Sequence, residues 1–579
     1  MNRLRKLITS VFAIIFISAA QEGFTAEVYY LGGTGQGGNG SQVNPSYSLK
    51  QRFLDLINFS PYNPSRSGRL SGYFSQEIDH NDVSGNISKS FLERKTLYVT
   101  ETNLNLMEKL GGDYNLQGQL FVRKSDDPRV DVRKDVRIKQ FDLKVMNPEN
   151  LYEFGEFYGD FSQLALGSSL QGAHIELSPR QDQKYQIIVG RKNEADSAAG
   201  LFQRNVGGLK ADHYFFENSK LFSNFRLGLQ AATSDDDPAT LERTSTTKNM
   251  KNTVVSTDGE ITTRGPLSLL YEYAYSFYEP DEDAGGAHTD KAGALRVSPR
   301  IRFNNWGFKY LYYTVSPKFY SDLGSAMPDK TQHQFSADYR FNPKASVELV
   351  ENYYYDHLAG SSQTKRTTND EKDVTFIFKP IDNRPSLMIR PYMNYIQTNS
   401  DDPGNTAQGL TKTFGVGFND VIRIIDLSYG AKYEYRSFDD EANGTSTEVS
   451  NRIGFNVSRE QKIFGHRLYL SLDPQMDFRR NKSNPDSKTD GTVGLGFNGQ
   501  YDITSRLVVR GGHNLNKFNA AQSANSYMQT RSFGELDLAL NKAKSAHFVT
   551  RYEFNHYGYQ DSSQSYNENR VIGKFLINF

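Results

Sequence analysis

Three absences in this chain of 579 residues exclude whole classes of protein. It contains no cysteine, which excludes disulfide bonds, thiolate metal sites, cysteine nucleophiles, lipid attachment through cysteine and covalent haem attachment. Beyond the N-terminus no stretch holds the about 18 apolar residues that a membrane helix needs, so a multi-pass helical membrane protein is excluded. Lys plus Arg and Asp plus Glu number 67 each, so no net charge indicates a nucleic-acid partner.

Aromatic side chains are abundant in an otherwise polar chain. The sequence has 38 Phe, 35 Tyr and one Trp, whereas its mean hydropathy is −0.63. Disordered chains are poor in aromatics, so disorder does not explain the polarity. A polar average with many Phe and Tyr is typical of a β-barrel in a bacterial outer membrane.

The first 20 residues have the pattern of a secretory signal peptide. Basic residues precede an apolar run from Leu7 to Ile17, and Ser18-Ala19-Ala20 offers the small residues that a signal peptidase reads. Cleavage after Ala26 is the alternative. We therefore expect residues 1–20 to be removed and the mature protein to lie outside the cytoplasm.

Apolar and polar residues alternate along most of the remaining chain. In 466–479, Leu468, Leu470 and Leu472 share a face with Met476, and the other face alternates with them and is mostly polar or charged. An apolar face of five or six alternate residues corresponds to about ten residues of strand, which matches a tilted strand that crosses a membrane. Such segments predict 26 strands in 69–579, with 22–26 as the range, the ones before about 205 being weaker.

The connections between these segments alternate in length. Short turns such as 304–305 and 342–344 are followed by longer polar stretches such as 317–331 and 481–490. Outer-membrane barrels have short periplasmic turns and long extracellular loops. Because an open sheet edge would leave unpaired backbone groups in lipid, the sheet must close. The predicted fold is all-β, a closed antiparallel transmembrane β-barrel with both termini in the periplasm.

Two segments depart from the strand pattern. Residues 158–172 look like an ordered loop that folds inward. Residues 27–68 precede the barrel and begin with a Gly-rich linker, 32–40, which lacks the strand, helix and acidic residue of a dinucleotide site. A short amphipathic helix follows and makes this segment a candidate plug, on the basis of Leu49, Phe53, Leu56 and Ile57.

The last strand carries alternating residues that end on an aromatic chain terminus: Val571, Gly573, Phe575, Ile577 and Phe579. This pattern resembles the C-terminal assembly signal of Gram-negative outer-membrane barrels, although that family usually has its glycine five residues before the end and Gly573 lies six before it. The resemblance implies a cell outer-membrane location, contact with outer-membrane lipid and recognition by the barrel-assembly machinery.

Charged residues fall on the predicted inward face. The candidates for a selectivity lining are Arg296, Arg300 and Arg302 on one strand and Arg467, Asp473, Asp477 and Arg479 on another. Further residues expected to point inward are Arg340, Arg390, Arg436, Arg452, Arg510, Arg551, Asp338, Asp426, Glu434, Glu535, Asp537 and Glu553. The alternative is that these charges pair across strands and keep the wall wet and rigid.

No catalytic, metal or cofactor motif stands out. The ten His are scattered without a zinc-type spacing, and we predict neither an enzyme nor a bound cofactor. Acidic clusters such as 235–237 and 439–441 are expected in surface loops, where a divalent cation could bridge them to lipopolysaccharide.

The predicted function is a porin-like channel for passive or charge-selective diffusion of small solutes. Two alternatives remain open. Barrels of about 26 strands resemble the sheath of porin–cytochrome conduits, which would enclose a periplasmic multihaem partner, and an export pore for polysaccharide or protein would use the same fold. A TonB-dependent receptor is excluded, because its plug of about 150 residues does not fit in the segment before the barrel.

Overall fold

The computed structural model describes residues 68–110, 113–131, 134–193, 201–215, 219–240, 249–280, 289–358, 366–401, 408–440, 447–481, 490–520 and 525–579. The predicted signal peptide and the candidate plug, with Leu49, Phe53, Leu56 and Ile57, lie outside these residues. No helix in the described ranges is long and apolar enough to cross a membrane.

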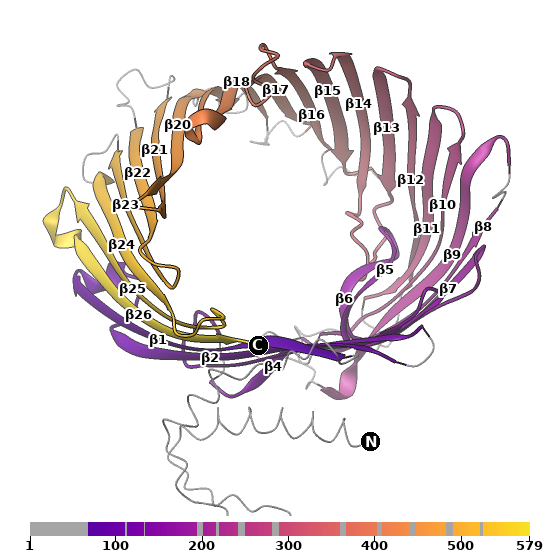
Figure 1. Cartoon of the computed structure of the whole chain (residues 1–579). Helices are drawn as coiled ribbons and strands as arrows, with labels where there is room; N and C mark the ends of the chain where they lie inside the picture. The colour runs from indigo at the N-terminus through magenta and orange to yellow at the C-terminus, as the bar shows by residue number, and fades with distance from the viewer. Residues whose placement is uncertain are drawn as a thin grey trace, which may run out of the picture.

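The described residues form one antiparallel sheet of 26 strands, in which every strand pairs with the next and β26 pairs with β1 (Figure 1). The first thirteen are β1 Gly68–Gly85, β2 Lys95–Lys109, β3 Asn115–Ser125, β4 Arg137–Met146, β5 Asn150–Ser162, β6 Leu166–Arg180, β7 Gln183–Asn193, β8 Gln203–Tyr214, β9 Phe222–Asp237, β10 Lys251–Thr263, β11 Leu267–Glu279, β12 Asp290–Arg302 and β13 Trp306–Val315. The others are β14 Lys330–Asn342, β15 Ala345–Asp356, β16 Thr367–Phe378, β17 Met388–Ser400, β18 Gly409–Ile422, β19 Leu427–Asp440, β20 Thr447–Ile463, β21 His466–Asn481, β22 Asp490–Asp502, β23 Leu507–Asn519, β24 Tyr527–Ala539, β25 Ala546–Tyr559 and β26 Tyr566–Asn578. The predicted closed barrel of 26 strands is confirmed.

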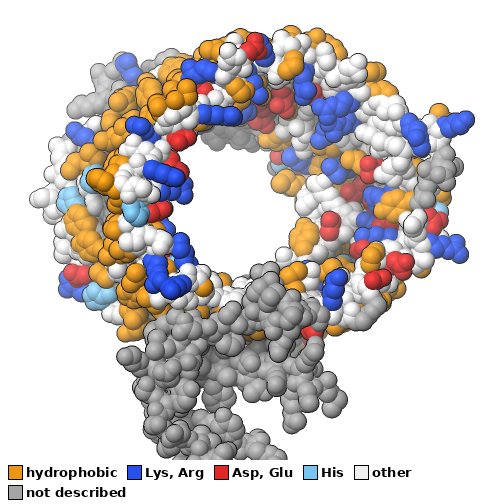
Figure 2. Space-filling view, in the orientation of Figure 1, with side chains coloured by type: hydrophobic (Ala, Val, Ile, Leu, Met, Phe, Trp, Pro, Cys, Tyr) orange, Lys and Arg blue, Asp and Glu red, His pale blue; other side chains and the backbone are white. Residues whose placement is uncertain are grey.

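The alternation along each strand separates the two faces of the wall. Leu472, Met476 and Phe478 of β21 are exposed on the outer face, and Asp477 lies on the inner one. Figure 2 shows hydrophobic side chains over the outer surface and charged ones around a central opening. Strands about 4.8 Å apart and tilted by about 40° make a 26-stranded ring about 50 Å across, too wide for wall side chains alone to fill.

The two ends of the barrel strand series meet at a continuous seam. The β1–β26 register runs from Tyr73↔Asn578 to Gly85↔Tyr566. The chain terminus extends it, because the Phe579 N–H donates to the Gly72 carbonyl at 3.0 Å and the Gly72 N–H donates to the Phe579 carbonyl at 2.8 Å. The residues of the predicted assembly signal therefore lie on the closing strand, although their recognition by an assembly machinery stays a prediction.

Three details of the sequence prediction are wrong. Residues 158–172 do fold inward as predicted, but as a hairpin of β5 and β6 and not as a loop. Asp426 is not an inward strand residue, because it lies in a left-handed conformation at the turn between β18 and β19. The 235–237 cluster belongs to β9 and not to a loop, and Asp236 is buried in an ion pair with Arg204 at 2.7 Å.

Candidate functional site

The hairpin of β5 and β6 leaves the wall halfway along its length. Pairing of β4 with β5 runs only from Met146↔Leu151 to Asp142↔Gly155, whereas β5 and β6 stay paired to each other up to the tip. Pairing of β6 with β7 ends at Gln171↔Arg191. Residues 156–171, called here the infolded hairpin, therefore turn away from the wall into the lumen, where Figure 1 shows the ends of β5 and β6.

A row of glycines lies where the hairpin bends. Gly155 pairs with Gly172, and Gly172 pairs with Gly190, so three neighbouring strands lack a side chain at one level. Gly155 has φ +106°, and a Cβ there would lie 2.1 Å from the Phe141 carbonyl oxygen. A Cβ at Gly172 would lie 2.2 Å from the Val189 carbonyl oxygen. The bend therefore requires glycine.

The infolded hairpin packs on the inner face of β7–β13. Its tip residues Leu164 and Ala165 are buried against small residues of the wall, Ala274 of β11 and Ala294 of β12 among them. A second cluster joins Phe157, Phe161, Leu166 and Leu170 of the hairpin to Ile188, Val206 and Ala232 of the wall and Leu323. Alanine and valine at inward positions let a second layer approach the wall closely, and each fully buried large side chain contributes about 1.5–3 kcal/mol.

Polar contacts fix the tip in this position. The Leu164 N–H donates to Glu272 Oε1 at 2.7 Å, and Glu272 itself is buried on β11. The loop 316–329 covers the tip, because the Gly167 N–H donates to the Leu323 carbonyl at 2.8 Å. Asp322 of this loop accepts from Arg204 at 2.7 Å. Hairpin and loop together form an inner layer over one side of the lumen.

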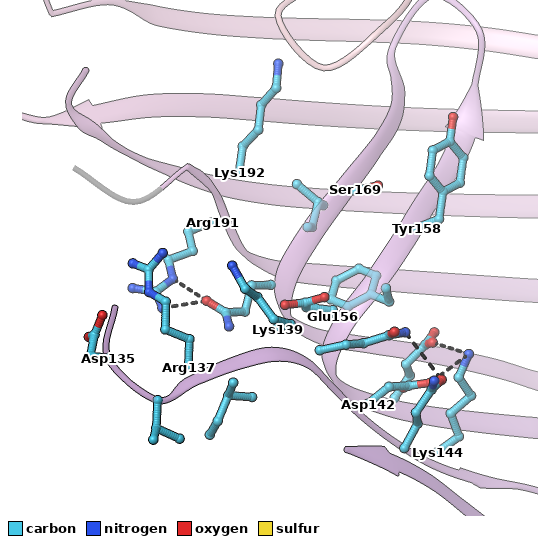
Figure 3. Close-up of a pocket in the computed structure, with 18 residues that line it drawn as sticks. Asp135, Arg137, Lys139, Asp142, Lys144, Glu156, Tyr158, Ser169, Arg191 and Lys192 are labelled. Carbon is cyan, nitrogen blue, oxygen red and sulfur yellow. Dashed lines mark hydrogen bonds and ion pairs between the residues drawn. The ribbon is translucent and has the colours of Figure 1, made fainter. Parts of the chain in front are cut away.

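A cavity of about 870 Å³ opens where the hairpin has left the wall (Figure 3). It is bounded by β4 on one side, by Arg191 and Lys192 at the end of β7 on the other, and by Tyr158 and Ser169 of the hairpin. We call this interruption of the wall the window.

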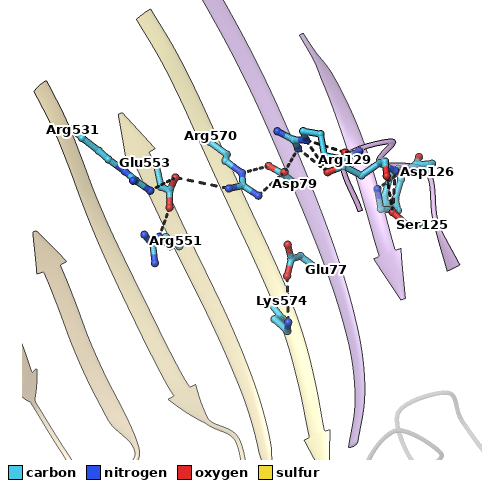
Figure 4. Close-up of polar contacts among 12 residues, drawn as sticks. Glu77, Asp79, Ser125, Asp126, Arg129, Arg531, Arg551, Glu553, Arg570 and Lys574 are labelled. Atoms are coloured by element: carbon cyan, nitrogen blue, oxygen red, sulfur yellow. Dashed lines mark hydrogen bonds and ion pairs between the residues drawn. The ribbon is translucent and has the colours of Figure 1, made fainter. Parts of the chain in front are cut away.

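A ladder of ion pairs crosses the seam on the inner face (Figure 4). Asp79 of β1, which is 2% exposed, accepts from Arg129 at 3.1 Å and from Arg570 of β26 at 2.9 Å. Glu553 of β25 contacts Arg570 at 3.9 Å and Arg551 at 2.6 Å. The closing strands are therefore joined by charge as well as by backbone hydrogen bonds.

The ladder continues along β24 and β23. Glu535 accepts from Arg510 at 2.6 Å and contacts Arg551 at 3.5 Å. Asp537 contacts Arg510 at 3.4 Å and lies 2.7 Å from His547 Nδ1. These inward charges pair across strands, so on this side of the lumen opposite charges largely compensate each other.

The other end of the ladder lies in the loop after β3. Asp127 is nearly buried and its carboxylate lies 2.7 Å from the Arg129 guanidinium. Burial by itself raises the pKa of Asp127, but the hydrogen bonds from the Arg129 side chain and backbone outweigh burial and hold the pKa below its ordinary value.

The predicted row on β12 lies on the inner face beside the infolded hairpin. Arg296, Arg300 and Arg302 have the same parity as Ala292 and Ala294, which pack against the tip. In the described ranges none of the three has a carboxylate within 4 Å, and the exposed Lys309 of β13 lies in register with Arg300. We call Arg296, Arg300, Arg302 and Lys309 the cationic patch.

The predicted set on β21 is differently placed. Arg467 pairs with Glu460 at 2.6 Å, and Asp477 contacts Arg479 at 3.3 Å and Arg452 at 3.2 Å. Asp473 lies on the same inward face. The structure thus does not bring the β12 and β21 residues into one cluster.

Sequence reasoning missed Lys309, Asp79 and the glycine row. Lys309 could not be identified from the sequence, because its position directly across from Arg300 depends on the register between β12 and β13. A usable signal did exist for the inner layer, since Ala274, Ala292 and Ala294 break the polar alternation of the inward face.

Comparisons with known proteins give distant likenesses only. No family model and no curated protein matches the chain. Among solved structures, the chain is similar to Pseudomonas aeruginosa OccK2 (OpdF) in complex with glucuronate, with 9% identity, 88% of this chain and 96% of that chain covered, and a TM-score of 0.28. The translocation pore of the P pilus usher PapC has 9% identity, 88% and 99% coverage and a TM-score of 0.29. Vibrio cholerae OmpT, an outer membrane protein, has 8% identity, 89% and 100% coverage and a TM-score of 0.22. These likenesses are too distant to show a function for this chain.

Proposed function

We propose that the protein is an outer-membrane channel through which small solutes diffuse along a polar lumen, with anions favoured at the cationic patch. The observation that carries this proposal is the central opening lined by charged side chains in Figure 2. The infolded hairpin and the loop 316–329 narrow this opening on the side that holds the cationic patch.

The cationic patch supports the preference for anions. Its residues lack ion-pair partners among the described residues, whereas the seam ladder is internally compensated. Two carboxylates in the described part of the chain lie near the patch without forming an ion pair within 4 Å: Glu272 of β11 is directly across from Arg296, and Asp338 of β14 lies across from Gly307, the register partner of Arg302. The four cations of the patch therefore outnumber them. A solute that passes the narrowed side therefore meets a net positive field.

Charge reversal of Arg296, Arg300 and Arg302 to Glu tests the proposal. A unit charge about 10 Å from an ion contributes about 0.4 kcal/mol in water, and 0.1 M salt reduces this by roughly a factor of three. Each reversal changes the charge by two units, and anions and cations respond with opposite sign. Three reversals therefore change the free-energy difference between anion and cation by about 1.7 kcal/mol, or roughly 20-fold in the anion-to-cation permeability ratio. The measurement is the reversal potential of purified protein in planar bilayers under a KCl gradient.

Arg467→Glu, Arg479→Glu and Arg452→Glu form the matched control, because they change the same formal charge on β20 and β21. We expect a smaller change in the permeability ratio there, since the inner layer narrows the opening on the opposite side. Equal shifts in both triple variants would contradict selection at the patch. A barrel that does not conduct and co-purifies with a periplasmic protein would instead support a sheath.

A further inference from the structure

In the described residues each strand is hydrogen-bonded to its neighbours around the barrel, and the window between β4 and β7 is a break in this wall. β4 and β7 are third neighbours in the sheet, so a wall without β5 and β6 between them leaves about 14 Å between strand axes. The break begins where β5 leaves the wall at Gly155 and extends to the end of the barrel that carries the long loops. The β4 residues that precede Asp142 have no register partner on β5. Below that level the wall is complete.

The lining of the window comes from both faces of the wall. Gln119 and Asp142 are lumen-facing residues, because they pair with each other in register and Gln119 lies near Gln140 at 3.3 Å on the inner face. Ile138 and Arg191 lie on the outer face. All four residues line the same cavity, because the strands that would separate the two faces have left the wall here. Among the residues that the structure describes, the window therefore connects the lumen with the outer surface.

The chemistry changes across the window. On its outer rim Ile138 is 67% exposed and Val189 is 62% exposed, as suits side chains that face lipid. The inside carries both signs of charge, with Lys144 bound to Glu153 at 2.6 Å. An apolar rim around a polar opening matches a molecule with an alkyl chain and a polar headgroup.

The open edge of β4 requires a polar environment. Backbone N–H and C=O groups at the unpaired edge of β4 cannot face hydrocarbon without losing their hydrogen bonds. Gln140 and Lys139 line the cavity at this edge and give it polar neighbours. Water or the headgroup of a bound molecule satisfies these groups.

We propose that the window is a lateral portal through which a single-chain amphiphile moves between the lumen and the surrounding membrane. The headgroup follows the polar lining and the chain leaves past the apolar rim. This inference goes beyond the proposed diffusion of solutes along the barrel axis. The two proposals can be tested separately, because ion conductance reports on the axial path and the test below reports on the window.

The absence of cysteine makes a direct test possible. A bimane fluorophore on Gln140→Cys would sit on the inner face at the window edge, and the probes are iodide in water and 5-doxyl-stearic acid in the vesicle membrane. We expect both to quench this label, with at least a twofold, saturable loss of intensity by the stearate. Heat-modifiable migration on gels confirms that each variant is folded.

Two control positions bracket the result. Gln475→Cys lies on the inner face of β21, which is paired on both sides, and its label should be quenched by iodide only. Leu472→Cys on the outer face should be quenched by the stearate only. If the Gln140→Cys label behaves like Gln475→Cys, the portal is refuted.

A second test of the portal narrows the window with bulky side chains. Glu156→Phe with Ser169→Phe adds bulk to the hairpin face that lines the cavity. Added to Gln140→Cys, this pair should at least halve quenching by the stearate and leave quenching by iodide in place. Unchanged stearate quenching in a folded variant would show that the chain reaches Gln140 by another route and would overturn the proposal.

Discussion

Expulsion of the hairpin tip is the sharpest perturbation that the structure offers. Leu164 is fully buried and its N–H is bonded to the Glu272 carboxylate. Leu164→Asp removes the burial of a leucine, about 2–3 kcal/mol, and brings a second carboxylate to Glu272, where an unpaired buried charge costs a further 3–5 kcal/mol. The seated state loses at least about 5 kcal/mol, which shifts the seating equilibrium by more than about a thousandfold.

The assay is thiol labelling of the wall beneath the tip. Ala294 is 2% exposed under Leu164, so a single Ala294→Cys should react with a membrane-impermeant thiol reagent only when the tip lifts. When opening is fast relative to labelling, the labelling rate follows the open fraction. We therefore expect Leu164→Asp to raise the rate at least a hundredfold, up to the rate of an exposed thiol.

Gln163→Asp is the matched control, because it adds the same charge one residue away on an exposed side chain. Its labelling rate should stay close to that of the parent Ala294→Cys protein. If Leu164→Asp folds into a barrel and labels no faster than the control, the tip is not held by the contacts described, and the inner layer is seated by something else.

Two further results are expected. Gly155→Ala should lower the free energy of unfolding by about 2 kcal/mol or more, through a positive φ and a clash with the neighbouring strand, whereas Gly454→Ala, with nothing within 4 Å of its Cβ, should change it by less than about 1 kcal/mol in urea titrations. Asp127 has a depressed pKa in the folded state, so its pairing with Arg129 stabilises the fold fully above the ordinary carboxyl pKa of about 3.9 and loses this contribution as the pH falls through the depressed value. The stability difference between the parent and Asp127→Asn should therefore be constant at neutral pH and shrink in acid, and a difference that grows in acid would contradict the assignment.

The strand series was predictable because each strand contains its own signal. Lipid on one face and water on the other impose alternation on every crossing, as in β21, and the lengths of the connections give the topology without knowledge of distant contacts. The prediction failed where that condition ends. Beyond Gly155 the hairpin faces a second protein layer and not lipid, so Phe157 and Phe161 follow a different rule.

The sequence predicts which face of the wall a charged residue lies on, but not which residue it forms an ion pair with. Parity alone places Arg510, Glu535 and Arg300 on the inner face. Whether an arginine is paired depends on the register between strands and on loops such as the one that carries Arg129, and neither can be read from one strand's sequence. The same parity therefore covers a compensated ladder on β23–β26 and an unpaired row on β12.

These two arrangements solve one physical problem on opposite sides of the lumen. A ring about 50 Å across cannot be filled by wall side chains, so its inner face must be either wet or covered. On β7–β13 small apolar residues accept a second layer, and the hairpin that supplies it is taken out of the wall, which creates the window. On the seam side the described residues supply no second layer, and Asp79 holds Arg570 of the closing strand instead. The window is thus the structural consequence of covering one half of the lumen with a part of the wall itself.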